Sequence, residues 1–128
     1  MLPALLPVFF SGMAAACTPA FKDAQTVESA RYILAWRTQP APIAVGSHFS
    51  LDLVICPKAD APPPQSLRID AQMPEHRHGM NYKPGISRVT TEPGRFRATG
   101  LMFHMPGRWE LAFDLGGGER LTHSLIID

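Results

Sequence analysis

Apolar and polar residues alternate along most of the chain after residue 30, as expected for strands that bury one face. The clearest case is 67–73, where Leu67, Ile69, Ala71 and Met73 alternate with polar residues. The pattern predicts strands over 32–37, 49–56, 67–73, 86–91, 95–103, 108–115 and 121–127. These segments predict an all-β fold, an antiparallel immunoglobulin-like (cupredoxin-like) β-sandwich of about seven strands.

Proline and glycine mark the breaks between these strands. The segment 57–66 contains three consecutive prolines and is predicted to be a loop, while 92–94 and 116–118 are predicted turns. Gly100 is a point where the strand over 95–103 could be interrupted. A helix over 27–36 is the main local alternative, but the Pro40-Ala41-Pro42 segment that follows and the period of two favour a strand.

The amino-terminal part of the chain has a different composition. Residues 1–20 carry no charged side chain, and an apolar run over 2–10 is followed by the small residues 14–16. This pattern predicts an export signal over 1–20, a polar linker over 21–28 and the sandwich domain over 29–128. The run is short and contains two prolines, which disfavours a transmembrane helix.

Cys17 directly follows the small residues, and two interpretations of it remain open. The segment resembles a bacterial lipobox, in which Cys17 would be acylated and Cys56 would be a buried free thiol. Alternatively, an ordinary signal is removed and Cys17 pairs with Cys56 in an oxidising compartment. Both interpretations place the protein in the periplasm or cell envelope. Contact with the membrane would occur only through an N-terminal lipid or an uncleaved signal.

The charge balance narrows the possible partners. The chain has 12 Lys and Arg residues against 11 Asp and Glu residues, without a basic cluster, so we expect no nucleic-acid partner. The 13 prolines argue against a helical bundle.

The segment 73–81 is rich in residues that bind soft metals. It contains Met73, His76, His78 and Met80, and imidazole nitrogen and thioether sulfur are ligands that copper, particularly Cu(I), accepts readily. Pro74, Gly79 and Pro84 favour a stiff turn that would order these ligands before the metal binds.

A second patch contains His104 and Met105. If each connection reverses the chain, the strands ending at Met73 and Phe103 run in the same direction and end at the same pole of the sandwich. We therefore expect His104 and Met105 to face the His76–Met80 segment.

Structural roles compete with ligation at each of these positions. Met73 completes the inward face of its strand, and Met80 can fill a gap in the core. His76 and His78 could be solvated loop residues, and His104 could serve the turn that it occupies. His48 and His123 are expected to be structural.

Other chemistries lack their characteristic residues. Cys56 has no His or Met at the close spacing of a blue-copper site, and no set of four Cys or His ligands for structural zinc is visible. The sequence has no nucleophile elbow, and Gly116–Gly118 precedes a strand rather than a helix. We therefore expect no enzymatic activity.

The motifs Met73-Pro74-x-His76-x-His78-Gly79-Met80, Gly94-x-Phe96 and Met105-x-Gly107-x-Trp109-x-Leu111 resemble those of the YtkA-like/FixH-like group of bacterial exported domains, over about residues 31–128. The resemblance implies an immunoglobulin-like sandwich and, from several relatives, copper handling or cytochrome oxidase assembly. By position it implicates His76, His78 and Met80 first, followed by His104 and Met105. FixH proteins have a transmembrane anchor, and this chain departs from them there.

Two functions are consistent with these observations. The first is a copper carrier, buffer or assembly factor that exchanges the ion with a donor or acceptor protein of the envelope. The second is a metal-free interaction module, in which loops at one pole bind a partner.

Overall fold

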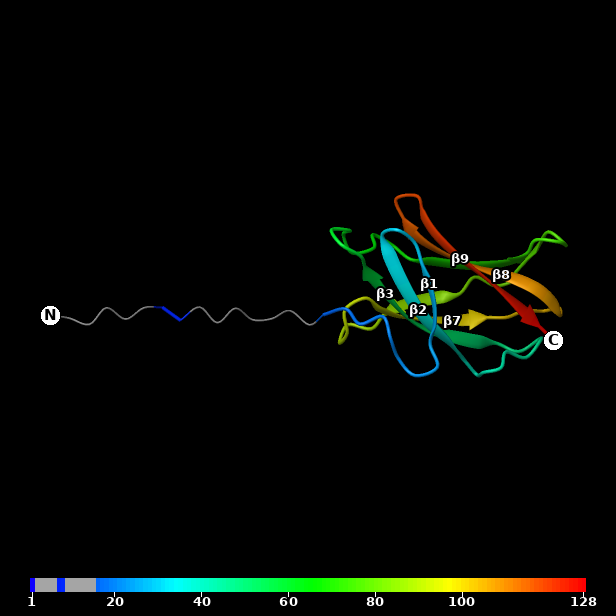
Figure 1. Cartoon of the computed structure of the whole chain (residues 1–128). Helices are drawn as coiled ribbons and strands as arrows, with labels where there is room; N and C mark the ends of the chain where they lie inside the picture. The colour runs from blue at the N-terminus through cyan, green and yellow to red at the C-terminus, as the bar shows by residue number, and fades with distance from the viewer. Residues whose placement is uncertain (2–6, 9–15) are drawn as a thin grey trace.

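The computed structural model describes residues 1, 7–8 and 16–128. Most of the predicted export signal therefore lies outside the described residues. Over 16–128 the fold is all β, with two antiparallel sheets packed face to face as a sandwich and no helix (Figure 1). Within these residues, no helix is long and apolar enough to span a bilayer.

The first sheet has five strands in the order β1-β2-β3-β7-β6. These are β1 (Gln25–Glu28), β2 (Tyr32–Gln39), β3 (Phe49–Pro57), β7 (Arg95–Leu101) and β6 (Gly85–Arg88).

The second sheet has four strands in the order β5-β4-β8-β9. These are β5 (His78–Gly79), β4 (Arg68–Met73), β8 (Gly107–Gly116) and β9 (Glu119–Ile127). The strands β2-β3-β7-β6 and β4-β8-β9 follow the ABED and CFG order of immunoglobulin constant-type domains, which confirms the predicted seven-stranded core. The strands β1 and β5 are additions to its edges.

The linker predicted over 21–28 is wrong at Gln25–Glu28, which forms β1. These residues are mostly exposed, so no buried face marks them in the sequence. The strand exists because its backbone pairs with β2, from Gln25 opposite Trp36 to Glu28 opposite Ile33. The predicted helix alternative over 27–36 does not occur, and the strand predicted over 86–91 is shorter, ending at Arg88. Near Gly100 the pairing of β7 with β3 shifts register, which is the expected interruption.

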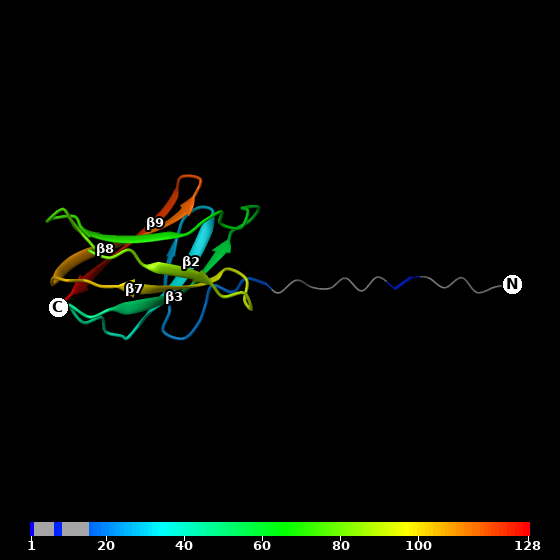
Figure 2. The ribbon, with the colours of Figure 1, turned by 180° about the vertical axis from the view of Figure 1, so that it is seen from behind.

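The two sheets face each other in Figure 2, and the core lies between them. Two tryptophans of this core, Trp36 and Trp109, are at most 2% exposed. Phe49 and Phe103 pack against each other with ring centroids 5.0 Å apart, and Phe103 stacks on Trp109 at 4.7 Å. Burying each such side chain contributes about 1.5–3 kcal/mol or more relative to exposure. This aromatic packing extends to the end of the sandwich where β7 ends and β8 begins.

The opposite end is cross-linked. Cys17 forms a disulfide with Cys56, with Cα atoms 5.6 Å apart. The Cys17 sulfur therefore takes the disulfide alternative, and while bonded to Cys56 it cannot carry the thioether of a lipidated cysteine. The predicted buried free thiol at Cys56 is wrong, although its side chain is buried. A disulfide at this position indicates an oxidising, extracytoplasmic compartment.

Two further contacts hold the segment after Cys17 against the five-stranded sheet. The Phe21 ring lies under the guanidinium groups of Arg37, at 5.1 Å, and Arg95, at 5.2 Å.

Gly94 lies beside the disulfide with a positive φ of 71°, and its carbonyl accepts a hydrogen bond from the Ile55 N–H. A Cβ at this position would overlap the Ile55 carbonyl oxygen, so only glycine fits there.

Candidate functional site: the histidine pole

The end of the sandwich opposite the disulfide carries four of the five histidines, and we call it the histidine pole. It is formed by the segment 40–48, which connects β2 and β3 of the five-stranded sheet, and by the segments 74–84 and 102–106, which lead from one sheet to the other (Figures 1 and 2). The histidines there are His48, His76, His78 and His104.

The strands β4 and β7 both end at this pole, as the sequence predicted. Their exits bring His78 and His104 together, with ring centroids 6.3 Å apart and the rings nearly perpendicular. His76 and His78 are 6.5 Å apart. Because metal–nitrogen bonds are about 2.0–2.1 Å long, two imidazoles on one metal ion have centroids roughly 5–6.5 Å apart. The observed separations are at the upper end of that range.

His104 is positioned by the aromatic core. Its ring meets the edge of Trp109 at 5.5 Å, and the Trp109 indole N–H donates a hydrogen bond to the Met105 carbonyl oxygen at 3.0 Å. One tryptophan thus orients the His104 ring and fixes the backbone that carries it. His104 Nδ1 is buried, and among the described residues it has no hydrogen-bond partner. A buried nitrogen in this state costs about 1–3 kcal/mol, so its retention needs an explanation.

The loop that carries His76 and His78 is held by backbone and charged contacts. The His76 N–H bonds the Met73 carbonyl oxygen at 3.1 Å, and His78 pairs with Met73 across β4 and β5. Glu75 accepts a hydrogen bond from Arg108 Nε at 2.6 Å, which ties the loop to β8. The Arg108 guanidinium and, to a smaller extent, a backbone hydrogen bond lower the pKa of Glu75 below its ordinary 4.5.

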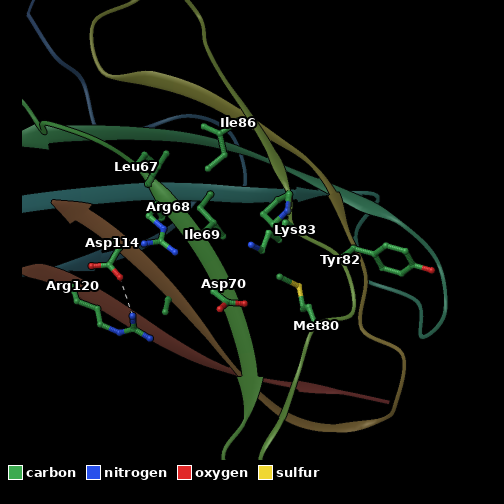
Figure 3. A pocket seen from close by; sticks show the side chains of 12 residues that line it. Leu67, Arg68, Ile69, Asp70, Met80, Tyr82, Lys83, Ile86, Asp114 and Arg120 are labelled. Carbon is green, nitrogen blue, oxygen red and sulfur yellow. Dashed lines mark hydrogen bonds and ion pairs between the residues drawn. The ribbon is translucent and has the colours of Figure 1, made fainter.

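The methionines lie in three different settings. Met73 is fully buried, and its Cε lies 2.6 Å from where a Cβ of Gly107 would stand, so it fills the core beneath the start of β8. This is the packing role that the sequence left as its alternative. Met80 lies on the wall of a groove beside β4 (Figure 3), and Met105 is partly buried against the core.

Of the six predicted ligands, the structure therefore brings His76, His78 and His104 to one pole, where the His78 ring lies 6.5 Å from His76 and 6.3 Å from His104. Among the described residues, no three His, Cys, Asp or Glu side chains are arranged to hold one metal ion. The geometry thus offers pairs of imidazoles, to which a thioether could be added.

Two features of the pole were missed by the sequence analysis. One is the role of Trp109 in orienting His104. It could have been suspected from the inward position of this tryptophan, because a buried indole N–H needs a hydrogen-bond acceptor. The other is the Glu75–Arg108 pair, which no local pattern marks because its residues are 33 positions apart. His48 contacts Tyr82 at 5.2 Å and His123 contacts Trp36 at 5.1 Å, in line with the structural roles expected for both histidines.

Comparison with known proteins identifies the fold but not a family. No protein-family model matches the chain, and no curated protein does. The chain is similar to the crystal structure of a DUF4426 family protein from Pseudomonas aeruginosa PAO1, with a TM-score of 0.50 and 12% sequence identity. The match covers 83% of this chain and 94% of the other. At that identity the likeness shows the shared β-sandwich alone.

Proposed function

We propose that this protein binds a copper ion, in the Cu(I) state, at the histidine pole through His78 and His104. The observation that carries the proposal is His104 Nδ1, a buried nitrogen to which the described residues offer no hydrogen-bond partner and whose ring lies 6.3 Å from that of His78. A metal ion bound between the two rings would give such a nitrogen a use that explains its cost.

The surrounding donors suit the same ion. Imidazole with thioether is a donor set that Cu(I) accepts, and Met105 and Met80 are the nearest such residues in sequence to the two histidines. His76, exposed and 6.5 Å from His78, is placed to take part in transfer to another protein.

The compartment and the motifs support this choice of metal. The disulfide fits an exported protein of the periplasm or cell envelope. The resemblance to the YtkA-like/FixH-like group favours copper handling. We propose a carrier or buffer without catalytic activity, whose partner is a copper donor or acceptor protein of the envelope.

One observation favours the metal-free interaction module instead. No three-residue His, Cys, Asp or Glu site is preformed among the described residues, and exposed loop residues such as Tyr82 (50% exposed) surround the pole. In that case the loops bind a partner directly.

A competitive Cu(I) titration separates the two functions. The wild type should take one equivalent of Cu(I) from a chromogenic chelator, and His78→Ala or His104→Phe should weaken binding about 100-fold, or close to 3 kcal/mol. The matched control is His48→Phe, which keeps a ring against Tyr82 and should bind as the wild type does. The proposed copper site is refuted if the chelator keeps its Cu(I) in the presence of the wild type. It is also refuted if the His78→Ala/His104→Phe double variant still binds one equivalent of Cu(I).

A further inference from the structure

The two long sides of the sandwich are closed differently. On one side β1 and β9 approach each other, and Ser29 Oγ donates a hydrogen bond to Glu119 at 2.5 Å. On the other side, β4 and β6 leave a groove of about 460 Å³ between them (Figure 3). Its larger aliphatic lining residues are Leu67, Ile69, Met80 and Ile86.

The groove exposes an unpaired stretch of strand edge. β5 pairs with β4 only at Gln72 and Met73, and the Met80 N–H then bonds the Ala71 carbonyl oxygen before the chain leaves the strand. Alternate residues of a strand direct their N–H and C=O groups to the same side, so those of Ile69 also point away from β8. Over the described part of the chain, no strand pairs with Ile69 on this side.

The neighbouring N–H group is already protected. Asp70 Oδ1 accepts a hydrogen bond from the Ala71 N–H at 2.8 Å, which caps that donor within the chain itself. The open part of the edge is therefore short and is centred on Ile69.

The charges around the groove are not balanced. Arg120 is paired with Asp114 at 3.0 Å, and the carboxylate of Asp70 is engaged by backbone. Arg68 and Lys83 also line the groove, and no ion pair or side-chain hydrogen bond within residues 16–128 involves either of them. A hydrogen bond from a neutral N–H leaves the negative charge of Asp70 in place, so the lining outside the Arg120–Asp114 pair has two cations and one carboxylate, a net charge of +1.

We propose that this groove binds an extended acidic segment of a partner protein, which adds to the four-stranded sheet beside β4 in line with β5. The partner's backbone would bond the N–H and C=O of Ile69, as in other cases of β-strand addition. Because successive residues face opposite sides, the residue opposite Ile69 would point inward to Met80 and Ile86. Its neighbour would lie opposite the exposed Arg68, where a carboxylate is favoured.

This proposal rests on β4 and its free edge and not on the histidines. It shares one residue with the proposed copper site, Met80, which lines the groove and is one of the additional thioether donors named above. Its probe is a fluorescein-labelled peptide of alternating Glu and Val with blocked ends, and binding is followed by anisotropy at low salt. Two control peptides accompany it, one of alternating Lys and Val and one in which every second amide is N-methylated.

The Glu-Val peptide should bind at least about tenfold more tightly than the Lys-Val peptide, and N-methylation of the amides that face β4 should abolish binding. Arg68→Gln/Lys83→Gln should weaken binding about five- to tenfold, whereas Lys22→Gln, a change at an exposed lysine on another surface, should have no effect. All three substituted residues are exposed, so the variants should unfold at the wild-type temperature.

Three results would overturn the proposal. Equal binding of the N-methylated peptide would show that no strand is added, and displacement of the peptide by free glutamate at similar concentrations would reduce the groove to a simple anion site. Equal binding of the Lys-Val and Glu-Val peptides would show that the groove does not prefer an acidic partner.

Discussion

The disulfide end and the histidine pole of the sandwich are held together by different kinds of contact. At the first, a covalent bond and the Phe21 ring between two arginines fix the chain onto the five-stranded sheet. At the second, the Gly46 N–H donates a hydrogen bond to the Phe103 carbonyl oxygen at 2.8 Å, and Phe103 packs on Phe49 and Trp109. One exposed ion pair, a hydrogen bond from Trp109 and ring contacts among histidines also join the loops there. The covalent crosslink thus lies at the end without candidate chemistry, whereas the histidine pole is held by noncovalent contacts alone among the described residues. The end with candidate chemistry includes His104 Nδ1, one of two buried side-chain nitrogens without a hydrogen-bond partner in the part of the chain that the structure describes; the other is Trp36 Nε1.

Removing the disulfide should have the largest effect. Cys17→Ser/Cys56→Ser releases a loop of 39 residues, and we expect a loss of about 3–4 kcal/mol in the free energy of unfolding. Urea unfolding measures it, and the wild type in reductant is the matched control. The double variant, where it is folded, should bind Cu(I) as the wild type does, because the histidines lie at the end of the sandwich opposite the disulfide. A loss of Cu(I) binding in the folded double variant would show that the two ends of the sandwich are coupled.

Two glycine substitutions compare the rigidity of the ends directly. Both Gly94 and Gly107 have positive φ, but a Cβ at Gly94 meets backbone whereas one at Gly107 meets the flexible tip of Met73. We expect Gly94→Ala to cost about 2–3 kcal/mol and Gly107→Ala about 1–2 kcal/mol. Thermal and urea unfolding of both variants gives the order. The reverse order would show that the histidine pole is the more rigid end.

His104→Phe should separate stability from function. The phenyl ring can keep the contact with Trp109 while removing the unpartnered nitrogen, so we expect the metal-free protein to gain about 1 kcal/mol. Urea unfolding without metal measures the change, and His48→Phe is the control at an exposed position. A clear loss of stability would mean that Nδ1 is satisfied in solution and that the argument from its burial fails.

The smallest effect concerns the Glu75–Arg108 pair. Because Arg108 lowers the pKa of Glu75, the pair stabilises the loop above the ordinary carboxyl pKa, and this contribution is lost as the pH falls through the lowered value. In Arg108→Gln the pKa of Glu75 should return toward 4.5, as measured by NMR titration of its carboxyl carbon. Arg120→Gln, which breaks the Asp114 pair instead, should leave the pKa of Glu75 unchanged. An unchanged value in Arg108→Gln would mean that the pair does not form in solution.

The sequence predicted the strands that bury a face, and it missed those that do not. The alternation in β4 is complete, with Ile69, Ala71 and Met73 buried, so both its position and its facing were predictable. β1 has a single apolar residue, Val27, and exists through pairing at a sheet edge, for which composition carries no signal.

The same limit applies to the candidate site. Strand direction alone predicted that His78 and His104 would meet, because it depends only on how many times the chain reverses. Whether Met73 packs or binds depends on its depth, and no periodicity separates a buried ligand from a buried core residue. The fate of Cys17 stayed open because both chemistries act on the same sulfur atom.

The placement of the crosslink gives the molecule a direction. β3 begins beside the histidine pole, and its nine residues span about 30 Å to the opposite end, where Cys56 is the residue before the last. An attachment through the residues that precede Cys17 would therefore be at the end of the sandwich farthest from His78 and His104. Such an attachment would leave the imidazoles at the distal end of the molecule, where they are accessible to a second protein.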